Sequence, residues 1–209
     1  MVQFNVFVKS DAYCEDTWWE GLAINSSQQT LEAEPDISNL PAQWVSWYTA
    51  VAYCRWISSA LGYPVRLPTE WEWQAAATGG HSDYLYPWGI DWNSNLANTK
   101  EHSVNSLVSV GLYPQGASPV GAMDMSGNLY EWCQNEFENP YKCDFTGILP
   151  RTTRGGAYFS FGSAQDAVKT TARFQDNPDG YFNKEQGRRT RVGIRLACDK
   201  LPMTETARI

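Results

Sequence analysis

The stretch Gly116-Ala-Ser-Pro-Val-Gly-Ala-Met-Asp-Met-Ser-Gly-Asn-Leu-Tyr-Glu-Trp132 decides the fold. Its centre is a Ser-Gly-Asn turn, which is flanked by two carboxylates, Asp124 and Glu131. The residues that follow, Leu129 to Phe137, are rich in the aromatic and apolar side chains that strands prefer. This part of the chain therefore predicts a tight turn that carries acidic residues at the start of a strand.

Helices are predicted upstream of this stretch. The first covers residues 3–10, where apolar side chains share one helical face. The second begins after a serine N-cap, Ser46, and ends at Gly62. The third begins with Thr69 and Glu72, which have the spacing of a capping box, and it ends before a pair of glycines. The shared face of the first helix consists of Phe4, Phe7 and Val8.

Periodicity is weaker in the rest of the chain. Residues 81–128 are rich in Asn, Ser, Gly and Pro, and residues 155–191 show no sustained period of either kind. Val192 to Cys198 alternates apolar with small or polar residues, which is typical of a half-buried strand. We therefore expect a single α+β domain over residues 1–209, with little regular secondary structure and long ordered loops.

The composition excludes several classes of protein. The chain has 209 residues, a net charge of −7 and no run of eighteen apolar residues, so neither nucleic-acid binding nor a membrane span is expected. Its start lacks the pattern of a signal peptide, which favours a cytoplasmic location. Aromatic residues make up 14% of the chain. Four of its tryptophans are expected to pack in the core: Trp44, Trp47, Trp88 and Trp132.

The cysteines do not suggest a disulfide framework or a zinc site, because their number is odd and no Cys-x-x-Cys pair occurs. Cys133 and Cys143 could pair across a loop. The two histidines, His81 and His102, are too few for a histidine-rich metal centre and are expected at the surface. The five cysteines are Cys14, Cys54, Cys133, Cys143 and Cys198.

An ordered series of motifs resembles the formylglycine-generating-enzyme (sulfatase-modifying factor) domain, a variant of the C-type-lectin-like fold. The resemblance extends from about Phe4 to Pro202 and implies this α+β fold. Domains of the family normally begin with a strand upstream of the first helix, so that strand is expected to be missing here. The motifs are Trp44–Trp47, Ala52–Trp56, Arg66–Ala77, Tyr86–Gly89, Leu96–Asn98, Gly116–Trp132, Arg154–Gly156 and Gly193–Arg195.

The turn around Gly127 is a candidate cation site. Carboxylates beside a tight turn offer the mixed oxygen ligands that Ca²⁺ prefers, although such acids also occur as solvated or capping residues. The resemblance implies a structural Ca²⁺ held by the side chains of Asp124 and Glu131 and by the backbone carbonyls of Gly127 and Leu129. It also suggests a second cation near Asn98.

The resemblance does not extend to the catalytic thiols. The family's oxidase activity needs two cysteines shortly after the Gly-Gly motif, and Ser160 and Gln165 stand at those positions. No cysteine lies between Cys143 and Cys198. A serine hydroxyl is a poor ligand for Cu(I) and has no thiol redox chemistry, so we expect neither copper, nor an organic cofactor, nor catalysis.

A binding surface is predicted in residues 157–164 and 173–183, where aromatic residues alternate with small and amide residues as they do in antibody paratopes. Taken singly, Phe159 or Phe161 is better explained by core packing, because alternation along a strand sends one face inward. The basic run that ends at Arg191 is interpreted as a solvated face or an ion-pair partner. The candidate ligand-binding residues are Tyr158, Phe159, Ser160, Phe161, Ser163, Gln165, Phe174, Asp176, Asn177, Tyr181 and Asn183.

A second resemblance concerns the variable proteins of diversity-generating retroelements, whose diversified stretch lies between the Gly-Gly motif and the final strand. Every residue from Tyr158 to Ala164 is reachable from an asparagine codon changed at its first two bases. The chain is therefore interpreted as a bacterial, non-catalytic module that binds a protein or another macromolecule. The alternatives are an accessory domain of a signalling protein and an oxidoreductase with altered chemistry.

Overall fold

The computed structural model describes residues 2–25, 27, 39–102, 104–160, 162–180 and 191–199. The helices are α1 (Val2–Lys9), α2 (Trp47–Leu61), α3 (Glu70–Thr78) and α4 (Ala164–Ala167). The strands are β1 (Val65–Arg66), β2 (Tyr130–Glu136), β3 (Arg151–Arg154), β4 (Phe174–Asp176), β5 (Val192–Gly193) and β6 (Ala197–Cys198). Short 3₁₀ helices lie at Asp11–Cys14, Asp16–Trp18, Ser94–Leu96, Lys100–His102 and Pro114–Gly116.

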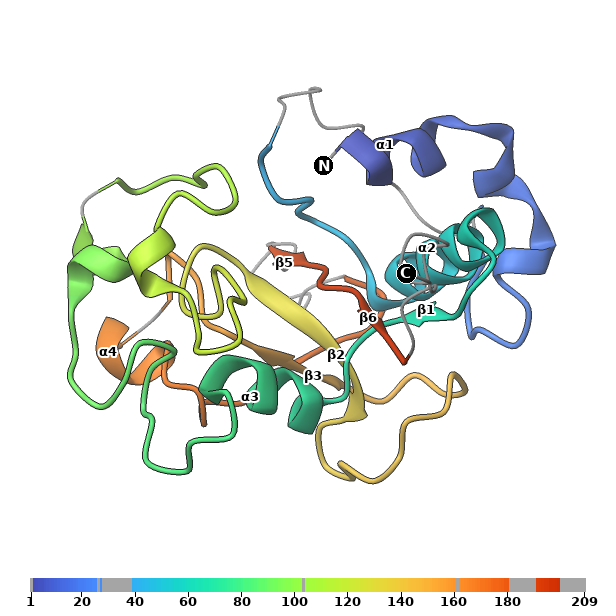
Figure 1. Cartoon of the computed structure of the whole chain (residues 1–209). Coiled ribbons are helices and arrows are strands. Elements are labelled where there is room, and N and C mark those ends of the chain that lie inside the picture. Colours follow the sequence, from blue (N-terminus) through green and yellow to red (C-terminus); the bar gives the residue numbers. More distant parts are fainter. Residues whose placement is uncertain are drawn as a thin grey trace, which may run out of the picture.

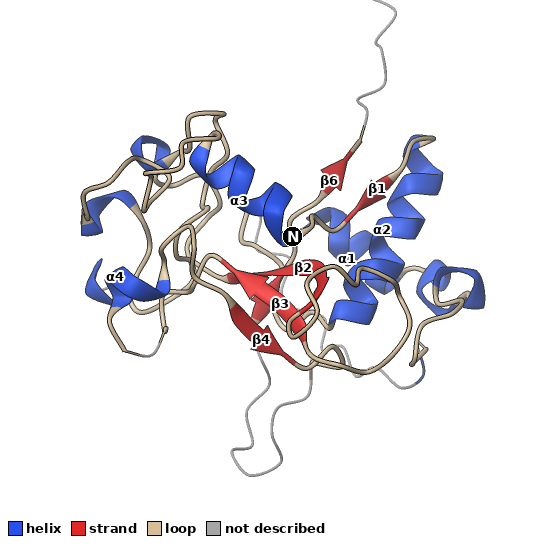
Figure 2. Ribbon diagram, turned by 90° about the horizontal axis from the view of Figure 1, so that it is seen from below, coloured by secondary structure: helices blue, strands red, loops and turns tan. Residues whose placement is uncertain are grey.

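A four-stranded sheet in the order β4-β3-β2-β5 forms the middle of the molecule (Figure 1). β3 is antiparallel to both β2 and β4, whereas β5 runs parallel to β2. α1 and α2 lie at one end of this sheet and α4 at the other, with α3 packed against β2 and β3 (Figures 1 and 2). Helices and a mixed sheet around shared cores confirm the α+β class.

The predicted helices are confirmed, and their ends follow from the residues that cap them. The Ser46 hydroxyl accepts a hydrogen bond from the Thr49 N–H at 3.0 Å, and α2 ends at Gly62 with a left-handed φ of 74°. At α3, Thr69 and Glu72 form both hydrogen bonds of a capping box. The predicted strand at Leu129–Phe137 is also confirmed, as β2.

Two tryptophans join α2 to β2. The Trp47 indole donates to the carbonyl of Cys133 at 2.9 Å, and the Trp132 indole donates to the carbonyl of Val45 at 2.7 Å. Both side chains are fully buried, as the sequence predicted. The other two differ from prediction, because Trp44 and Trp88 are only half-buried.

The predicted strand from Val192 to Cys198 is divided between two sheets. β5 pairs with β2, whereas β6 pairs with β1 in a separate two-stranded sheet. The sequence also gave no sign of β3, whose four residues are all buried although each is polar or charged. All five cysteines are free, so the suggested pairing of Cys133 with Cys143 is wrong. Within the described residues, no helix combines the length and apolar character needed to cross a membrane.

Candidate functional site

The chain turns sharply where β3 ends, and only glycine fits this turn. Gly155 and Gly156 have φ values of 89° and 68°, in the left-handed region. A Cβ atom at Gly156 would lie 2.6 Å from the carbonyl oxygen of Ala167, at the end of α4. The Gly-Gly motif therefore brings the following residues into a close turn against α4.

The turn continues through Ser160, one of the residues predicted to bind a ligand. Its side chain is buried, with a hydroxyl 2.9 Å from that of Tyr130, and it accepts a hydrogen bond from the Ala157 N–H at 2.8 Å. Tyr158 is also buried, and its hydroxyl contacts the guanidinium of Arg191. The structure therefore places Ser160 and Tyr158 as supports of the turn rather than at the surface.

Half-buried aromatic rings surround Tyr130. Its ring makes edge contacts with Phe159 and Phe174, with centroids 5.9 and 5.0 Å apart. Burial raises the pKa of Tyr130, so it stays a neutral hydroxyl next to Ser160. The guanidinium of Arg191 lies 4.8 Å from the ring of Trp44 and 5.6 Å from that of Phe159. We call Trp44, Tyr130, Phe159, Phe174 and Arg191 the aromatic cluster.

Sequence reasoning missed three members of this cluster, and it gave Tyr130 no role beyond the strand predicted at Leu129–Phe137. Arg191 was interpreted as part of a solvated or ion-paired run, and Trp44 was expected in the core. Trp44 instead has a φ of 60°, which is unusual and strained for a bulky residue. No local sequence signal marks this conformation. The next residue, Val45, donates its N–H to the Val192 carbonyl at 3.2 Å and so ties the loop to β5.

The remaining predicted binding residues take several positions. Ser163 and Gln165 are exposed on α4, where the Ser163 hydroxyl caps the helix by accepting from the Asp166 N–H. Asp176 is half-buried at the end of β4, and Asn177 beside it is exposed. The other predicted residues, Phe161, Tyr181 and Asn183, lie outside the described part of the chain.

The two carboxylates of the predicted cation site face one cavity of about 510 Å³, between the start of α1 and the 123–131 turn. Glu131 is already engaged there. Its oxygens accept two hydrogen bonds of 2.7 Å from the Arg195 guanidinium and one of 2.7 Å from the Trp73 indole. Burial opposes the positive charge of Arg195, but the Glu131 carboxylate outweighs this effect and raises the pKa of Arg195.

Asp124 is less fully satisfied. It has a left-handed φ of 57°, and one carboxylate oxygen accepts the Gly111 N–H at 2.7 Å. Burial, assisted by the nearby Glu131 charge, raises the pKa of Asp124. Gly127 and Leu129 line the same cavity. The structure thus brings together the four residues predicted to hold Ca²⁺.

The second suggested cation position, near Asn98, has an unusual feature of its own. The Asn98 amide nitrogen donates to the Ser106 carbonyl and to the side chain of Asn128. Its amide oxygen is buried and has no hydrogen-bond partner among the described residues. A buried oxygen without a donor is costly, and a bound cation or water would satisfy it.

The cysteine thiols do not form a redox pair within the described structure. Cys54 and Cys133 are buried, and burial raises the pKa of Cys54 to about 12 and raises that of Cys133 as well. Such thiols stay protonated at neutral pH and are inert as nucleophiles or metal ligands. Cys14 and Cys198 are exposed and unpaired.

Comparison with known proteins is consistent with the motifs. The family model described as "Sulfatase-modifying factor enzyme 1-like domain" matches residues 1–200. The serine/threonine-protein kinase pkn1 of Chlamydia caviae is 32% identical, with 79% of this chain and 26% of that protein covered. The formylglycine-generating enzyme of Streptomyces coelicolor is 31% identical, with 78% of this chain and 57% of that protein covered. The chain thus spans about a quarter to somewhat over half of these two relatives.

The Treponema denticola variable protein 1 has a similar structure. Its TM-score is 0.62 at 22% identity, with 88% of this chain and 81% of that chain covered. This likeness confirms the predicted C-type-lectin-like fold of the formylglycine-generating-enzyme type.

Replacing Glu131 by Gln should destabilise the fold, because Arg195 keeps its charge and loses its partner. We expect a loss of about 2–3 kcal/mol in the free energy of unfolding, somewhat less than for a fully buried pair, because 26% of the Arg195 side chain is exposed. Urea denaturation in the presence of a chelator measures it. The control is Glu138→Gln, at an exposed position. If both variants lost the same free energy of unfolding, the Glu131–Arg195 pair would not be the stabilising contact.

Proposed function

This chain belongs to the sulfatase-modifying factor enzyme 1-like domain family, and we propose that it serves as a non-catalytic binding module of that family. Its partner is a protein or another macromolecular surface. It binds through the aromatic cluster and the exposed side chains of α4.

The observation that carries this proposal is the state of Ser160. A catalytic residue needs a group that is free to react, whereas the Ser160 hydroxyl is buried and bonded to both Tyr130 and the Ala157 N–H. Gln165, at the second cysteine position, is an exposed amide on α4. Neither residue supplies a soft ligand for copper or a thiol for electron transfer.

The binding role is supported by how the aromatic cluster is held. The rings of Phe159 and Phe174 are half-buried, and each is braced by the edge of Tyr130. Rings fixed in this way offer contact area without losing much side-chain entropy when a partner binds. The polar side chains of Ser163, Gln165 and Asn177 are exposed nearby in sequence and can supply adaptable hydrogen bonds.

We further propose that the module is a variable protein of a diversity-generating retroelement. The likeness to the Treponema denticola variable protein supports this, as does the position of Phe159, Phe174 and Arg191 after the Gly-Gly motif. A template repeat and a reverse transcriptase in the genomic neighbourhood would be expected, and their absence would remove this part of the proposal.

The kinase relative favours a second candidate, an accessory domain of a signalling protein. The matched region is only about a quarter of that kinase, so a domain of this family is one part of a larger protein there. Both candidates bind through surface residues. They differ in whether residues after Gly156 vary between copies of the gene.

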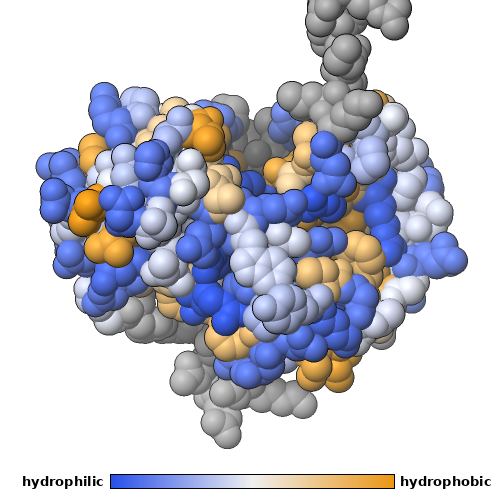
Figure 3. All heavy atoms as spheres, turned by 60° about the horizontal axis from the view of Figure 1, so that its bottom comes forward, coloured by the Kyte–Doolittle hydropathy of each residue, from blue (hydrophilic) through white to orange (hydrophobic). Residues whose placement is uncertain are grey.

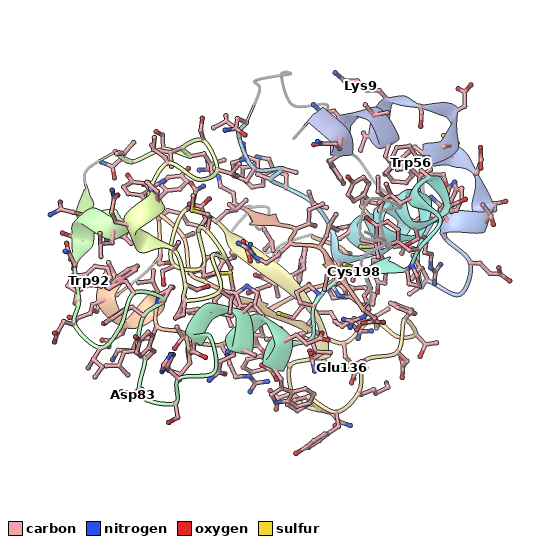
Figure 4. The ribbon with its side chains drawn as sticks, in the orientation of Figure 1. Lys9, Trp56, Asp83, Trp92, Glu136 and Cys198 are labelled. Carbon is pink, nitrogen blue, oxygen red and sulfur yellow. The ribbon has the colours of Figure 1, made fainter. Side chains whose placement is uncertain are left out.

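A photo-crosslinking amino acid at Gln165 should capture a discrete partner when the protein is expressed in its native cells. Position 165 lies on exposed α4, whereas the control position, Lys9, lies on α1 at the other end of the molecule (Figures 1 and 4). Denaturing gels should show a new adduct for position 165 and none for position 9. The Phe159→Ala change should reduce the adduct at least about threefold, because an anchoring ring is lost. An adduct of equal yield at both positions would refute the proposed face.

Oxygen consumption with Cu(I) and a cysteine-containing peptide should stay at the background of the Ser160→Ala variant. The family mechanism needs thiols that this chain lacks at positions 160 and 165. The formylglycine-generating enzyme of Streptomyces coelicolor serves as the positive control. Turnover above the Ser160→Ala background would favour the oxidoreductase alternative.

We also propose a structural Ca²⁺ at the 123–131 turn, and the oxygen atoms present fit it. Of about four lone-pair positions on a carboxylate, Glu131 uses three and Asp124 uses one. The carbonyl of Gly127, which also accepts the Leu129 N–H at 2.8 Å, and that of Leu129 add two more oxygens. Water would complete the six to eight that Ca²⁺ takes. Bound there, the ion would link the turn to β2 and play no part in a reaction.

Chelator should lower the melting temperature of the wild-type protein, and added Ca²⁺ should restore it, because only the folded state holds the ligands together. The Asp124→Asn variant should melt at one temperature in both conditions. Asp83→Asn, at an exposed position, should behave as wild type. A wild-type melting temperature that ignores both chelator and Ca²⁺ would rule the ion out.

The raised pKa of Asp124 gives this test a second readout. A carboxyl whose folded pKa is raised stabilises the fold below its unfolded pKa, and this contribution disappears as pH rises through the folded value. In the presence of chelator, the free energy of unfolding of the wild type should therefore fall, relative to that of Asp124→Asn, as pH rises from the unfolded pKa of Asp124 through its folded pKa. Ca²⁺ should reduce the difference, because it stabilises the charged form.

A further inference from the structure

A second concave site lies on the face of α3, separate from the aromatic cluster. It is a hollow of about 260 Å³ between the first turns of α3 and the loop that follows β2, whose last residue, Glu136, is labelled in Figure 4. Polar side chains cover much of this side of the molecule, and its apolar side chains form separate clusters (Figure 3). None of the residues lining the hollow belongs to the aromatic cluster or to the acidic turn.

Two exposed aromatic residues form the rim. Trp71 on α3 is 47% exposed and Tyr141 on the loop is 87% exposed. Their ring centroids are 5.5 Å apart with an angle of 39° between the planes. Neither the Trp71 indole N–H nor the Tyr141 hydroxyl has a hydrogen-bond partner among the described residues. The rim thus offers flat apolar faces next to free donors.

The interior of the hollow is positively charged. Arg154 and Arg173 line it together with a single carboxylate, Glu70, which leaves one net positive charge. Arg173 pairs directly with Glu70, through nitrogen–oxygen distances of 2.5 and 3.0 Å. Arg154 is further away, 4.0 Å from the same carboxylate. The carboxylate therefore balances Arg173 better than it balances Arg154.

Arg154 is incompletely satisfied. Its side chain is 1% exposed. One terminal nitrogen donates to Gln74 at 2.7 Å and to the Thr170 carbonyl at 2.9 Å, and the other donates to the Thr171 carbonyl at 3.4 Å. Its Nε has no partner among the described residues. A guanidinium stays charged at any ordinary pH, so a buried one without full pairing carries a free-energy cost. An anion in the hollow would reduce that cost.

We propose that this hollow binds a carboxylate attached to a flat apolar ring, with the ring on Trp71 and Tyr141 and the carboxylate toward the positive charge of Arg154 and Arg173. A carboxylate matches the planar guanidinium groups, and the faces of Trp71 and Tyr141 match the ring. The volume accommodates one ring with its acid group and leaves no room for a folded chain. A small aromatic acid and the C-terminal aromatic residue of a peptide share this chemistry.

The test follows the indole N–H signals of the ¹⁵N-labelled protein, with the Trp71 signal assigned by its loss in Trp71→Phe. Phenylacetate should move this signal with a dissociation constant of about 1–10 mM, as expected for a fragment in a small open site. Phenylacetamide, which has the same shape and no charge, should bind at least about tenfold more weakly. N-acetylglycyl-phenylalanine and its C-terminal amide repeat the comparison for a peptide end.

Matched variants separate charge from shape. Thr171 lines the hollow and is exposed, so Thr171→Asp adds one negative charge where Thr171→Asn adds none. The first should abolish the phenylacetate shift and the second should retain it. Tyr141→Ala should weaken binding about fivefold through loss of one ring face. Ile148→Ala, at an exposed site outside the hollow, should leave binding unchanged.

The acids identify the source of the ligand. Tighter binding of phenylacetate than of the peptide acid indicates a small aromatic acid, and the reverse indicates a peptide C-terminus; both support the site. The proposal is wrong if neither acid moves the Trp71 signal, if acid and amide move it equally, or if Thr171→Asp binds as well as Thr171→Asn. Because this site shares no residue with the aromatic cluster, its failure would leave the proposed binding module untouched.

Discussion

The rest of the structure depends on two reciprocal hydrogen bonds between β2 and the segment that begins α2. Trp47 donates to the backbone of Cys133, and Trp132 donates to the backbone of Val45. Each bond joins segments more than eighty residues apart in sequence. An indole buries a large apolar area and places one donor at its edge, so a single side chain both fills the core and satisfies a distant carbonyl. In a fold with few regular strands, such bonds replace the ladder that a larger sheet would supply.

The core around these two tryptophans contains the positive charge of Arg151. The guanidinium of Arg151 lies 4.0 Å from the ring of Trp47 and donates to the carbonyls of Gln134 and Thr146. Burial lowers the pKa of Arg151, yet the aromatic face and the carbonyl groups keep the charge tolerable. Gln134 lies where the pairing of β2 with β3 is irregular and Thr146 lies in the loop before β3, so both carbonyls are open to the guanidinium. The long loops and the buried arginines are therefore two consequences of one architecture.

Sequence reasoning succeeded where the determinant was local. Ser46, Gly62 and the Thr69–Glu72 box define helix ends through contacts within a few residues, and all were identified. It failed at β3, because the hydrophobic alternation that indicates a buried strand is absent from Arg-Thr-Thr-Arg. It also failed for Arg191 and Trp44, because their stacking depends on the parallel pairing of β5 with β2, which no spacing in the sequence reveals. The four predicted cation ligands were brought together because they belong to one turn and the strand that follows it.

The aromatic excess of the chain divides by the kind of contact that each ring makes. Trp47, Trp73 and Trp132 use their indole N–H groups on buried acceptors, so they belong to the scaffold. Phe159 and Phe174 have no polar atom to satisfy, and they pack edge-on against Tyr130 with part of each ring uncovered. Because no scaffold hydrogen bond passes through their side chains, substitution there costs packing at one edge of the fold while the reciprocal tryptophan bonds remain. A chain built in this way can vary the side chains at positions 159 and 174 without losing the framework that holds this surface in place.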